Sequence, residues 1–167
     1  LQADPDRLVI IDEAYVDFGT QSCVALTARY DNLLVTQTFS KSRSLAGARL
    51  GFAIGDPALI ADLNTVRNSV NPYNVNRMTQ AAGIAAIREN DYFMGCCQTI
   101  RKNRTDTIVQ LRAMGFTVLE SQANFVFARC DAMPGAALYA ALRRRGVLVR
   151  HFDTPALTDW LRITIGT

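Results

Sequence analysis

The chain has 167 residues, of which 49% are apolar and 20% are charged, and its formal net charge is +3. This composition is typical of a globular protein, and so small a charge gives no argument for a nucleic-acid or membrane partner. No apolar run approaches the roughly 20 residues that span a bilayer. The four cysteines show no CxxC spacing and there is one histidine, so we expect no metal site, and reduced thiols in a cytoplasmic protein.

The first half of the chain contains three β-prone segments. We expect strands at about Leu8–Asp12, Leu33–Thr38 and Arg49–Ile54, with an irregular stretch between the first two. The small residues from Ser42 to Gly47 predict a flexible segment before the third strand. Asp56 and Pro57 then indicate the N-cap and first residue of a helix that runs to about residue 68.

The second half begins after a break in the helical pattern. The segment from Ser69 to Asn74 contains Pro72, and we place a domain boundary after residue 73. Two helices are expected next, followed by three β-like segments with a helix before the third, and then a last strand. These elements are predicted at Val75–Glu89, Asp91–Met114, Phe116–Leu119, Asn124–Ala128, Pro134–Arg145, Val147–Arg150 and Leu161–Ile165. Glycines end the second and third of these helices.

Chemically active side chains gather at the ends of the first two predicted strands. They are Asp12 and Tyr15 after the first strand, Thr38, Ser40 and Lys41 after the second, and Arg49 eight residues beyond Lys41. Open α/β sheets place their ligands at strand ends. A phosphate dianion favours hydroxyl donors together with a planar arginine cation. The pattern therefore predicts an anion-binding site at this edge.

Several segments also resemble a known protein family. IIDEAYVDFG, TFSKSRSLAGARLGFAIG, PYNVN, ANFVFAR and VLVRHF…LRITIGT are similar to segments of the class II pyridoxal-phosphate aminotransferases of fold type I, and among these to the histidinol-phosphate aminotransferases. The resemblance runs from Arg7 to Thr167. It implies an α/β fold in two parts: residues 1–73 as the C-terminal part of a large domain with a mixed, mostly parallel sheet, and residues 74–167 as a small α+β domain.

The resemblance further implies that the chain is a fragment. Nothing in it matches the upstream strands and glycine-rich loop of the family, and it ends where family members continue into another helix. We therefore expect that an N-terminal half and a short C-terminal piece are missing.

By resemblance, pyridoxal 5'-phosphate is the expected cofactor. Lys41 would bind it and later move protons, Asp12 would pair with the pyridine nitrogen, and Tyr15 would bond the ring oxygen. Thr38, Ser40 and Arg49 would hold the phosphate. Arg162 would clamp the α-carboxylate of the substrate, and Arg150 would bind a distal phosphate.

Each of these side chains also has an ordinary structural interpretation. An isolated lysine is usually a solvated surface charge, and hydroxyls at a strand end often bond the local backbone. Arg43 has no match among the phosphate-binding residues, so we expect it to be solvated. We expect Glu13 and Asp17 to be structural or solvated.

The resemblance implies transamination between histidinol phosphate and 2-oxoglutarate, giving imidazole acetol phosphate and glutamate in histidine biosynthesis, by a cytoplasmic homodimer. An aromatic amino acid transaminase or a threonine-phosphate decarboxylase relative would keep Asp12, Tyr15 and Lys41 as well. An alternative of another class is a catalytically silent scaffold or oligomerisation module, which the absent upstream residues favour for the isolated chain.

Overall fold

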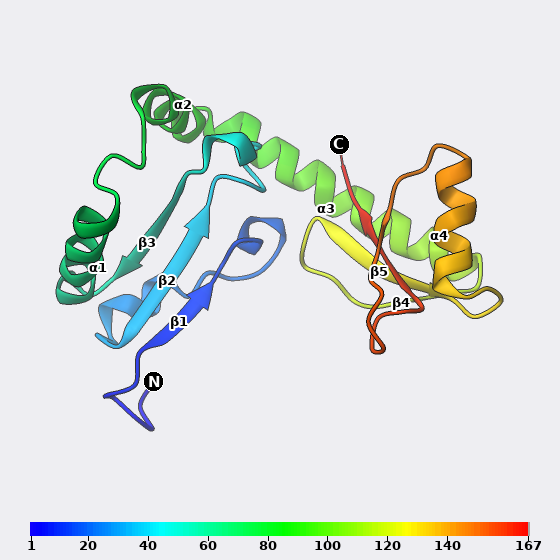
Figure 1. Cartoon of the computed structure of the whole chain (residues 1–167), viewed down its shortest axis with the longest axis horizontal. Coiled ribbons are helices and arrows are strands. Elements are labelled where there is room, and N and C mark those ends of the chain that lie inside the picture. Colours follow the sequence, from blue (N-terminus) through cyan, green and yellow to red (C-terminus); the bar gives the residue numbers. More distant parts are fainter. Residues whose placement is uncertain (167) are drawn as a thin grey trace. The chain divides into compact units, whose positions relative to one another are not determined.

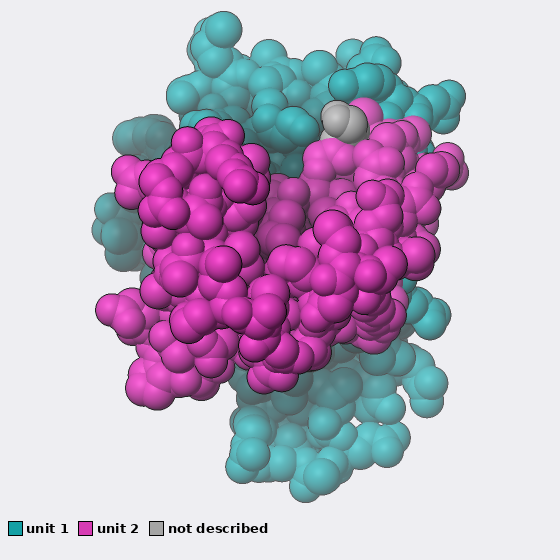
Figure 2. Space-filling view, turned by 90° about the vertical axis from the view of Figure 1, so that its right-hand side faces the viewer, with its two compact units in different colours: residues 1–94 teal, residues 95–167 magenta. Residues whose placement is uncertain are grey.

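The computed structural model describes residues 1–166 of the chain (Figure 1). Two compact units are present, unit 1 with residues 1–94 and unit 2 from residue 95 onward (Figure 2). The domain boundary expected after residue 73 lies inside unit 1 and stays a prediction. Within the described residues, no helix is long and apolar enough to cross a membrane.

Unit 1 contains a three-stranded mixed sheet in the order β1-β2-β3. Strand β1 (Val9–Asp12) is parallel to β2 (Leu33–Thr38), and β3 (Gly51–Gly55) is antiparallel to β2. The start of β2 is apolar and buried, as expected of a strand between two neighbours. Because β1 and β2 are parallel, their carboxyl ends lie at the same edge of the sheet.

Short helices connect these strands, and longer ones follow them. The irregular stretch after β1 contains the 3-10 helices η1 (Val16–Phe18) and η2 (Val24–Ala28), and η3 (Ala46–Ala48) precedes β3. The longer helices are α1 (Pro57–Val70), α2 (Arg77–Arg88) and α3 (Asn90–Ala113), and α3 contains the boundary between the units.

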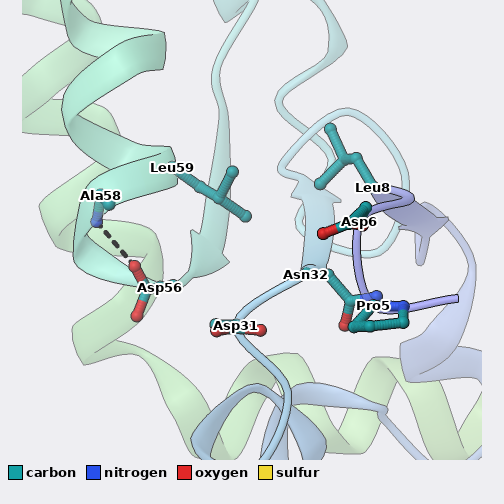
Figure 3. A pocket seen from close by; sticks show the side chains of 8 residues that line it. All are labelled: Pro5, Asp6, Leu8, Asp31, Asn32, Asp56, Ala58 and Leu59. Carbon is teal, nitrogen blue, oxygen red and sulfur yellow. Dashed lines mark hydrogen bonds between the residues drawn. The ribbon is translucent and has the colours of Figure 1, made fainter. Parts of the chain in front are cut away.

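Side chains cap the first two of these long helices. The Oδ1 atom of Asp56 accepts a hydrogen bond from the Ala58 amide at 2.8 Å (Figure 3), which confirms the predicted N-cap. Asn76 caps α2 in the same way, through the Thr79 amide at 2.9 Å. Each cap satisfies an amide that has no partner inside its helix.

Unit 2 contains a four-stranded antiparallel sheet in the order β4-β5-β7-β6. Its strands are β4 (Phe116–Val118), β5 (Phe125–Cys130), β6 (Arg150–His151) and β7 (Trp160–Thr164), and α4 (Gly135–Arg144) lies between β5 and β6 in the chain. The glycines after α3 and α4, Gly115 and Gly146, both have positive φ, which suits them to end a helix.

The two faces of this sheet differ in chemistry. Val126 and Ala128 of β5 and Val118 of β4 pack with Ile108 of α3 to form the core of unit 2. Residues directly opposite each other in antiparallel strands share a face, so the remaining positions of β5, β6 and β7 form the second face. We call this second face the arginine–aromatic face, after four of its residues: Phe125, Phe127, Arg150 and Arg162.

A buried arginine attaches α3 to the loop before β5. Arg104 is 7% exposed and donates to the Ala123 carbonyl at 2.7 Å. Burial lowers the pKa of the Arg104 guanidinium, and the positive charge of Arg101 lowers this pKa further. The contact holds the loop that leads into Phe125.

The strand expected at Val147–Arg150 was wrong in its first three residues. Only Arg150 and His151 pair with β7, and the side chain of Leu148 is 81% exposed. An apolar run forms a strand only where it hydrogen-bonds a neighbouring strand, and this segment pairs with β7 only from Arg150 onward, although β7 continues to Thr164.

Candidate functional site

Strands β1 and β2 bring the predicted site residues of unit 1 to one edge. Asp12 pairs in register with Thr36, and the Glu13 amide donates to the Thr36 carbonyl at 2.8 Å. The chain turns immediately after β1, since the Ala14 amide donates to Asp12 Oδ1 at 3.0 Å. The Asp12 side chain is exposed at this edge.

Lys41 and Tyr15 lie together at the same edge. The Nζ atom of Lys41 is 5.5 Å from the centroid of the Tyr15 ring. Lys41 is exposed and Tyr15 is half-buried, and a cation at this distance is attracted by the negative face of the ring. Two residues that are 26 positions apart in the sequence therefore present an amine and a phenol to the same space.

The three residues predicted to bind phosphate surround the turn that follows β2. Thr38 Oγ1 accepts from the Ser40 amide at 3.1 Å and donates to the Leu50 carbonyl at 3.4 Å. Arg49 adopts a left-handed conformation with φ 53°, and its exposed guanidinium donates once, to the Ala46 carbonyl at 3.0 Å. A guanidinium has five N–H donors, and this one makes no other hydrogen bond within residues 1–166, so N–H groups remain for an anion. The Thr38 hydroxyl bonds two backbone groups, one in the turn and one at Leu50, twelve residues further on.

Glu13 is structural. Its carboxylate is 7% exposed and accepts hydrogen bonds from Ser22 Oγ at 2.8 Å, the Cys23 amide at 2.5 Å and Gln37 Nε2 at 2.9 Å. Buried carboxylates are stable only with such donors. The contacts fix the segment between Asp12 and Tyr15 against β2.

The expectation that Arg43 is solvated was wrong. Its guanidinium donates to the Ala86 carbonyl at 2.6 Å and lies 3.8 Å from the centroid of the Phe93 ring. Its neighbour Ser42 was expected in a flexible segment, but Ser42 is buried and donates to Asp17 Oδ2 at 2.5 Å. Asp17 is therefore structural. The local sequence gives no sign of these partners, because they lie 25 and 43 residues away.

Arg150 and Arg162 lie on the arginine–aromatic face of unit 2. They are directly opposite each other in the β6–β7 pairing. The Arg162 guanidinium is 5.1 Å from the Phe125 ring, and that of Arg150 is 5.3 Å from the Phe152 ring. Arg162 Nε is buried and has no hydrogen-bond partner among the residues that the structure describes.

The pocket in Figure 3 lies at the opposite edge of the unit 1 sheet. It is lined by residues that precede β1 and β2 or follow β3, including three carboxylates, Asp6, Asp31 and Asp56. The negative charges of these carboxylates repel an anionic ligand. No group of three or more His, Cys, Asp or Glu side chains within residues 1–166 is placed to hold a metal ion.

The chain is similar to known proteins along its whole length. The family model "Aminotransferase class I and II" matches residues 2–167. A histidinol-phosphate aminotransferase of Bradyrhizobium diazoefficiens is 54% identical over the whole chain, which covers 48% of that protein. The chain thus spans about half the length of the curated relatives it matches.

Solved structures agree with the sequence matches. The crystal structure of the histidinol-phosphate aminotransferase of Clostridium acetobutylicum is 26% identical with a TM-score of 0.88, and the alignment covers 99% of this chain and 52% of that one. The enzyme of Sinorhizobium meliloti, solved in complex with pyridoxal-5'-phosphate, is 25% identical with a TM-score of 0.84, and the alignment covers 98% and 45%.

Proposed function

The chain belongs to the aminotransferase class I and II family, and from this we propose that it carries the lysine and the arginines of a pyridoxal-phosphate-dependent aminotransferase. The activity is proposed for the intact protein, since the chain spans about half the length of its relatives. The proposed reaction is amino transfer from histidinol phosphate to 2-oxoglutarate, giving imidazole acetol phosphate and glutamate. A cytoplasmic homodimer is part of the proposal.

The observation that carries the proposal is the position of the Lys41 amine over the Tyr15 ring, 5.5 Å from its centroid, at the edge where β1 delivers Asp12. The donor set suits pyridoxal phosphate. An exposed primary amine can attach to an aldehyde, a carboxylate can pair with a protonated ring nitrogen, and Arg49 keeps N–H groups for a phosphate.

The residues of the chain then have separate tasks. When bound, pyridoxal phosphate supplies an electron sink for the α-carbon of the substrate. Asp12 would hold the ring nitrogen protonated, and the Tyr15 hydroxyl would donate to the ring oxygen. Lys41 would hold the cofactor through Nζ, and its amine would also take and return the substrate proton, a transfer worth roughly 10²–10⁴ in rate. Thr38, Ser40 and Arg49 would bind the phosphate.

The arginine–aromatic face supports the substrate part of the proposal. Like charges directly opposite in a sheet are destabilising, and a buried guanidinium N–H without a partner costs free energy. An anionic ligand relieves both costs for Arg150 and Arg162. We assign Arg162 to the carboxylate of glutamate or 2-oxoglutarate, and Arg150 to the phosphate of histidinol phosphate.

Cofactor trapping tests the proposal. The intact protein is mixed with pyridoxal phosphate and reduced with borohydride, and the modified peptide is identified by mass spectrometry. We expect the adduct on Lys41 and none on Lys102, the other lysine of this chain. Amino transfer from histidinol phosphate, compared with an aromatic amino acid, tests the substrate. An intact protein with no adduct would support the silent-scaffold alternative.

A further inference from the structure

Two consecutive residues after Lys41 are held by partners on different elements of unit 1. Serine and arginine in a surface turn are ordinarily solvated, but Ser42 is only 8% exposed and Arg43 is half-buried. The turn itself is tight, because the Ser44 amide donates to the Lys41 carbonyl at 3.2 Å and the Leu45 amide to the Phe39 carbonyl at 2.9 Å. Local hydrogen bonds fix the shape of this turn, and the two side chains fix its place.

The first partner is a carboxylate close to Tyr15. Ser42 Oγ donates to Asp17 Oδ2 at 2.5 Å, and Asp17 is the middle residue of η1. Ser42 is adjacent to Lys41, and Asp17 lies two residues after Tyr15. The bond therefore joins the segment that carries the amine to the segment that carries the ring.

The second partner lies where α2 ends and α3 begins. Arg43 donates to the carbonyl of Ala86, in the last turn of α2, at 2.6 Å. Carbonyls in that turn lack partners inside the helix, and a cation also complements the helix dipole there. The guanidinium also lies over the ring of Phe93 in the first turn of α3, 3.8 Å from its centroid. Arg43 thus connects the turn to the end of α2 and the start of α3.

We propose that Asp17 and Ser42 form a positioning pair that holds Lys41 Nζ over the Tyr15 ring, while Arg43 fixes the other side of the turn. This inference rests on the proposed role of Lys41. Ser42 touches neither the amine nor the ring, so it acts through the backbone of its neighbour. A hydrogen bond to a carboxylate is stronger than one between neutral groups, which suits a contact that must hold a reactive group in place.

Without the hydrogen bond between Ser42 and Asp17, the turn should spend less time in the arrangement that places Lys41 Nζ over the Tyr15 ring. A tenfold fall in the population of that arrangement corresponds to about 1.4 kcal/mol. Small displacements of a reacting group have large effects on rate. We therefore expect about a tenfold loss of kcat in Ser42→Ala. The KM for the amino donor should change by less than about twofold, because the substitution removes no contact with the substrate.

The test compares the intact protein with Ser42→Ala, Asp17→Ala and the double variant, and with Ser44→Ala as a control. Ser44 is an exposed serine of the same turn, and no side-chain hydrogen bond of its own is recorded within residues 1–166. If the two residues act as a pair, the double variant loses no more than either single variant. The urea midpoint of each variant separates lost positioning from lost folding.

Two measurements report on the position of Lys41 independently of turnover. In cofactor-free protein, brief acetylation is read as the ratio of modified Lys41 to modified Lys102, an exposed lysine that is ion-paired with Asp106 at 2.6 Å. We expect the ratio to rise in Ser42→Ala, because the amine leaves the ring. In loaded protein, visible circular dichroism per bound cofactor should fall, because the cofactor loses its fixed orientation.

An unchanged acetylation ratio and an unchanged dichroism signal in Ser42→Ala would overturn the inference. Equal changes in Ser44→Ala would also overturn it, because they would show a general effect of altering the turn. A protein that forms no cofactor adduct at Lys41 refutes the proposed function instead. The acetylation ratio still decides the positioning pair in that case, because it needs no cofactor.

Discussion

Arg150 of β6 and Arg162 of β7 stand directly opposite each other across an antiparallel pairing. Their guanidinium groups lie against different rings, Phe152 and Phe125, at 5.3 and 5.1 Å. These rings are connected through Phe127, which stacks on Phe152 with centroids 6.0 Å apart and meets Phe125 edge-on at 5.9 Å. Each guanidinium therefore has an aromatic partner of its own, which is consistent with the separate anions proposed for the two arginines.

Substituting the two arginines should separate the substrates. Arg150→Ala should lower kcat/KM for histidinol phosphate by about 10–100-fold, the loss expected for a charge-assisted hydrogen bond, and leave glutamate nearly unaffected. Arg162→Ala should lower kcat/KM for glutamate and 2-oxoglutarate by a similar factor. Steady-state kinetics with each substrate checks this division.

Arg129 provides the control for the arginine variants. It lies on the same sheet but is ion-paired with Asp131 at 2.9 Å and contacts the Trp160 ring. Its charge is already matched, so Arg129→Ala should leave both substrates within about twofold of the parent. Equal losses for every substrate in the Arg150 and Arg162 variants would contradict the separate assignments.

Lys41→Ala should abolish turnover while the fold survives. The side chain is exposed and buries little apolar surface, so its loss should leave the urea midpoint unchanged. Its amine is the proposed proton carrier, and we expect less than about 1% of the parental rate. Lys102→Ala, which removes the other lysine of the chain from an exposed helix surface, should retain full activity. Substantial transamination by Lys41→Ala would disprove its role.

Asp12→Asn should slow turnover more than it weakens cofactor binding. A neutral amide cannot hold the ring nitrogen protonated, so the electron sink is weaker, while the amide oxygen still accepts from the Ala14 amide. Activity at saturating cofactor, together with cofactor titration, separates the two effects. Parental turnover at saturating cofactor would argue against the pairing with the ring nitrogen.

Substituting the neighbouring carboxylate, Glu13, should affect stability more than turnover. Glu13 accepts three hydrogen bonds in a buried position. Glu13→Gln places an amide group where donors already point, so we expect a loss of about 1–3 kcal/mol in the free energy of unfolding. Urea denaturation measures it. At a temperature where the variant is folded, its turnover should exceed that of Asp12→Asn.

Local chemistry predicted much of the fold. The Asp56 cap, the glycines that end α3 and α4, and strand β2 appear where residue types alone place them. The edge that gathers Asp12 and Lys41 was also predictable, because two strands that carry such residues at their ends suggest a parallel pair. These features depend on a few residues that are close in sequence.

The contacts of Ser42, Arg43 and Glu13 could not be predicted in this way. Their hydrogen-bond partners lie between 9 and 43 residues away and are backbone groups or common polar side chains. Hydrophobic periodicity carries no information on which polar residue another one meets. The short β6 could not be predicted either, because an apolar run does not reveal at which residue it begins to pair with its neighbour.

Two helix glycines, Gly135 of α4 and Gly95 of α3, should respond in opposite ways to substitution by alanine. A Cβ atom on Gly135, the first residue of α4, would meet the Thr158 carbonyl oxygen and lie 2.8 Å from Asp159 Cα. Backbone atoms cannot move aside as a flexible side chain can, so Gly135→Ala should lower the free energy of unfolding by about 1–3 kcal/mol. Gly95 lies inside α3, and apart from its chain neighbours and the surrounding backbone of its own helix no atom lies within 4 Å of its added Cβ. Gly95→Ala should therefore raise the free energy of unfolding by about 0.5–1 kcal/mol, because alanine favours a helix. Urea denaturation of both variants checks the two signs, and a stabilised Gly135→Ala would show that α4 does not approach the loop before β7 this closely.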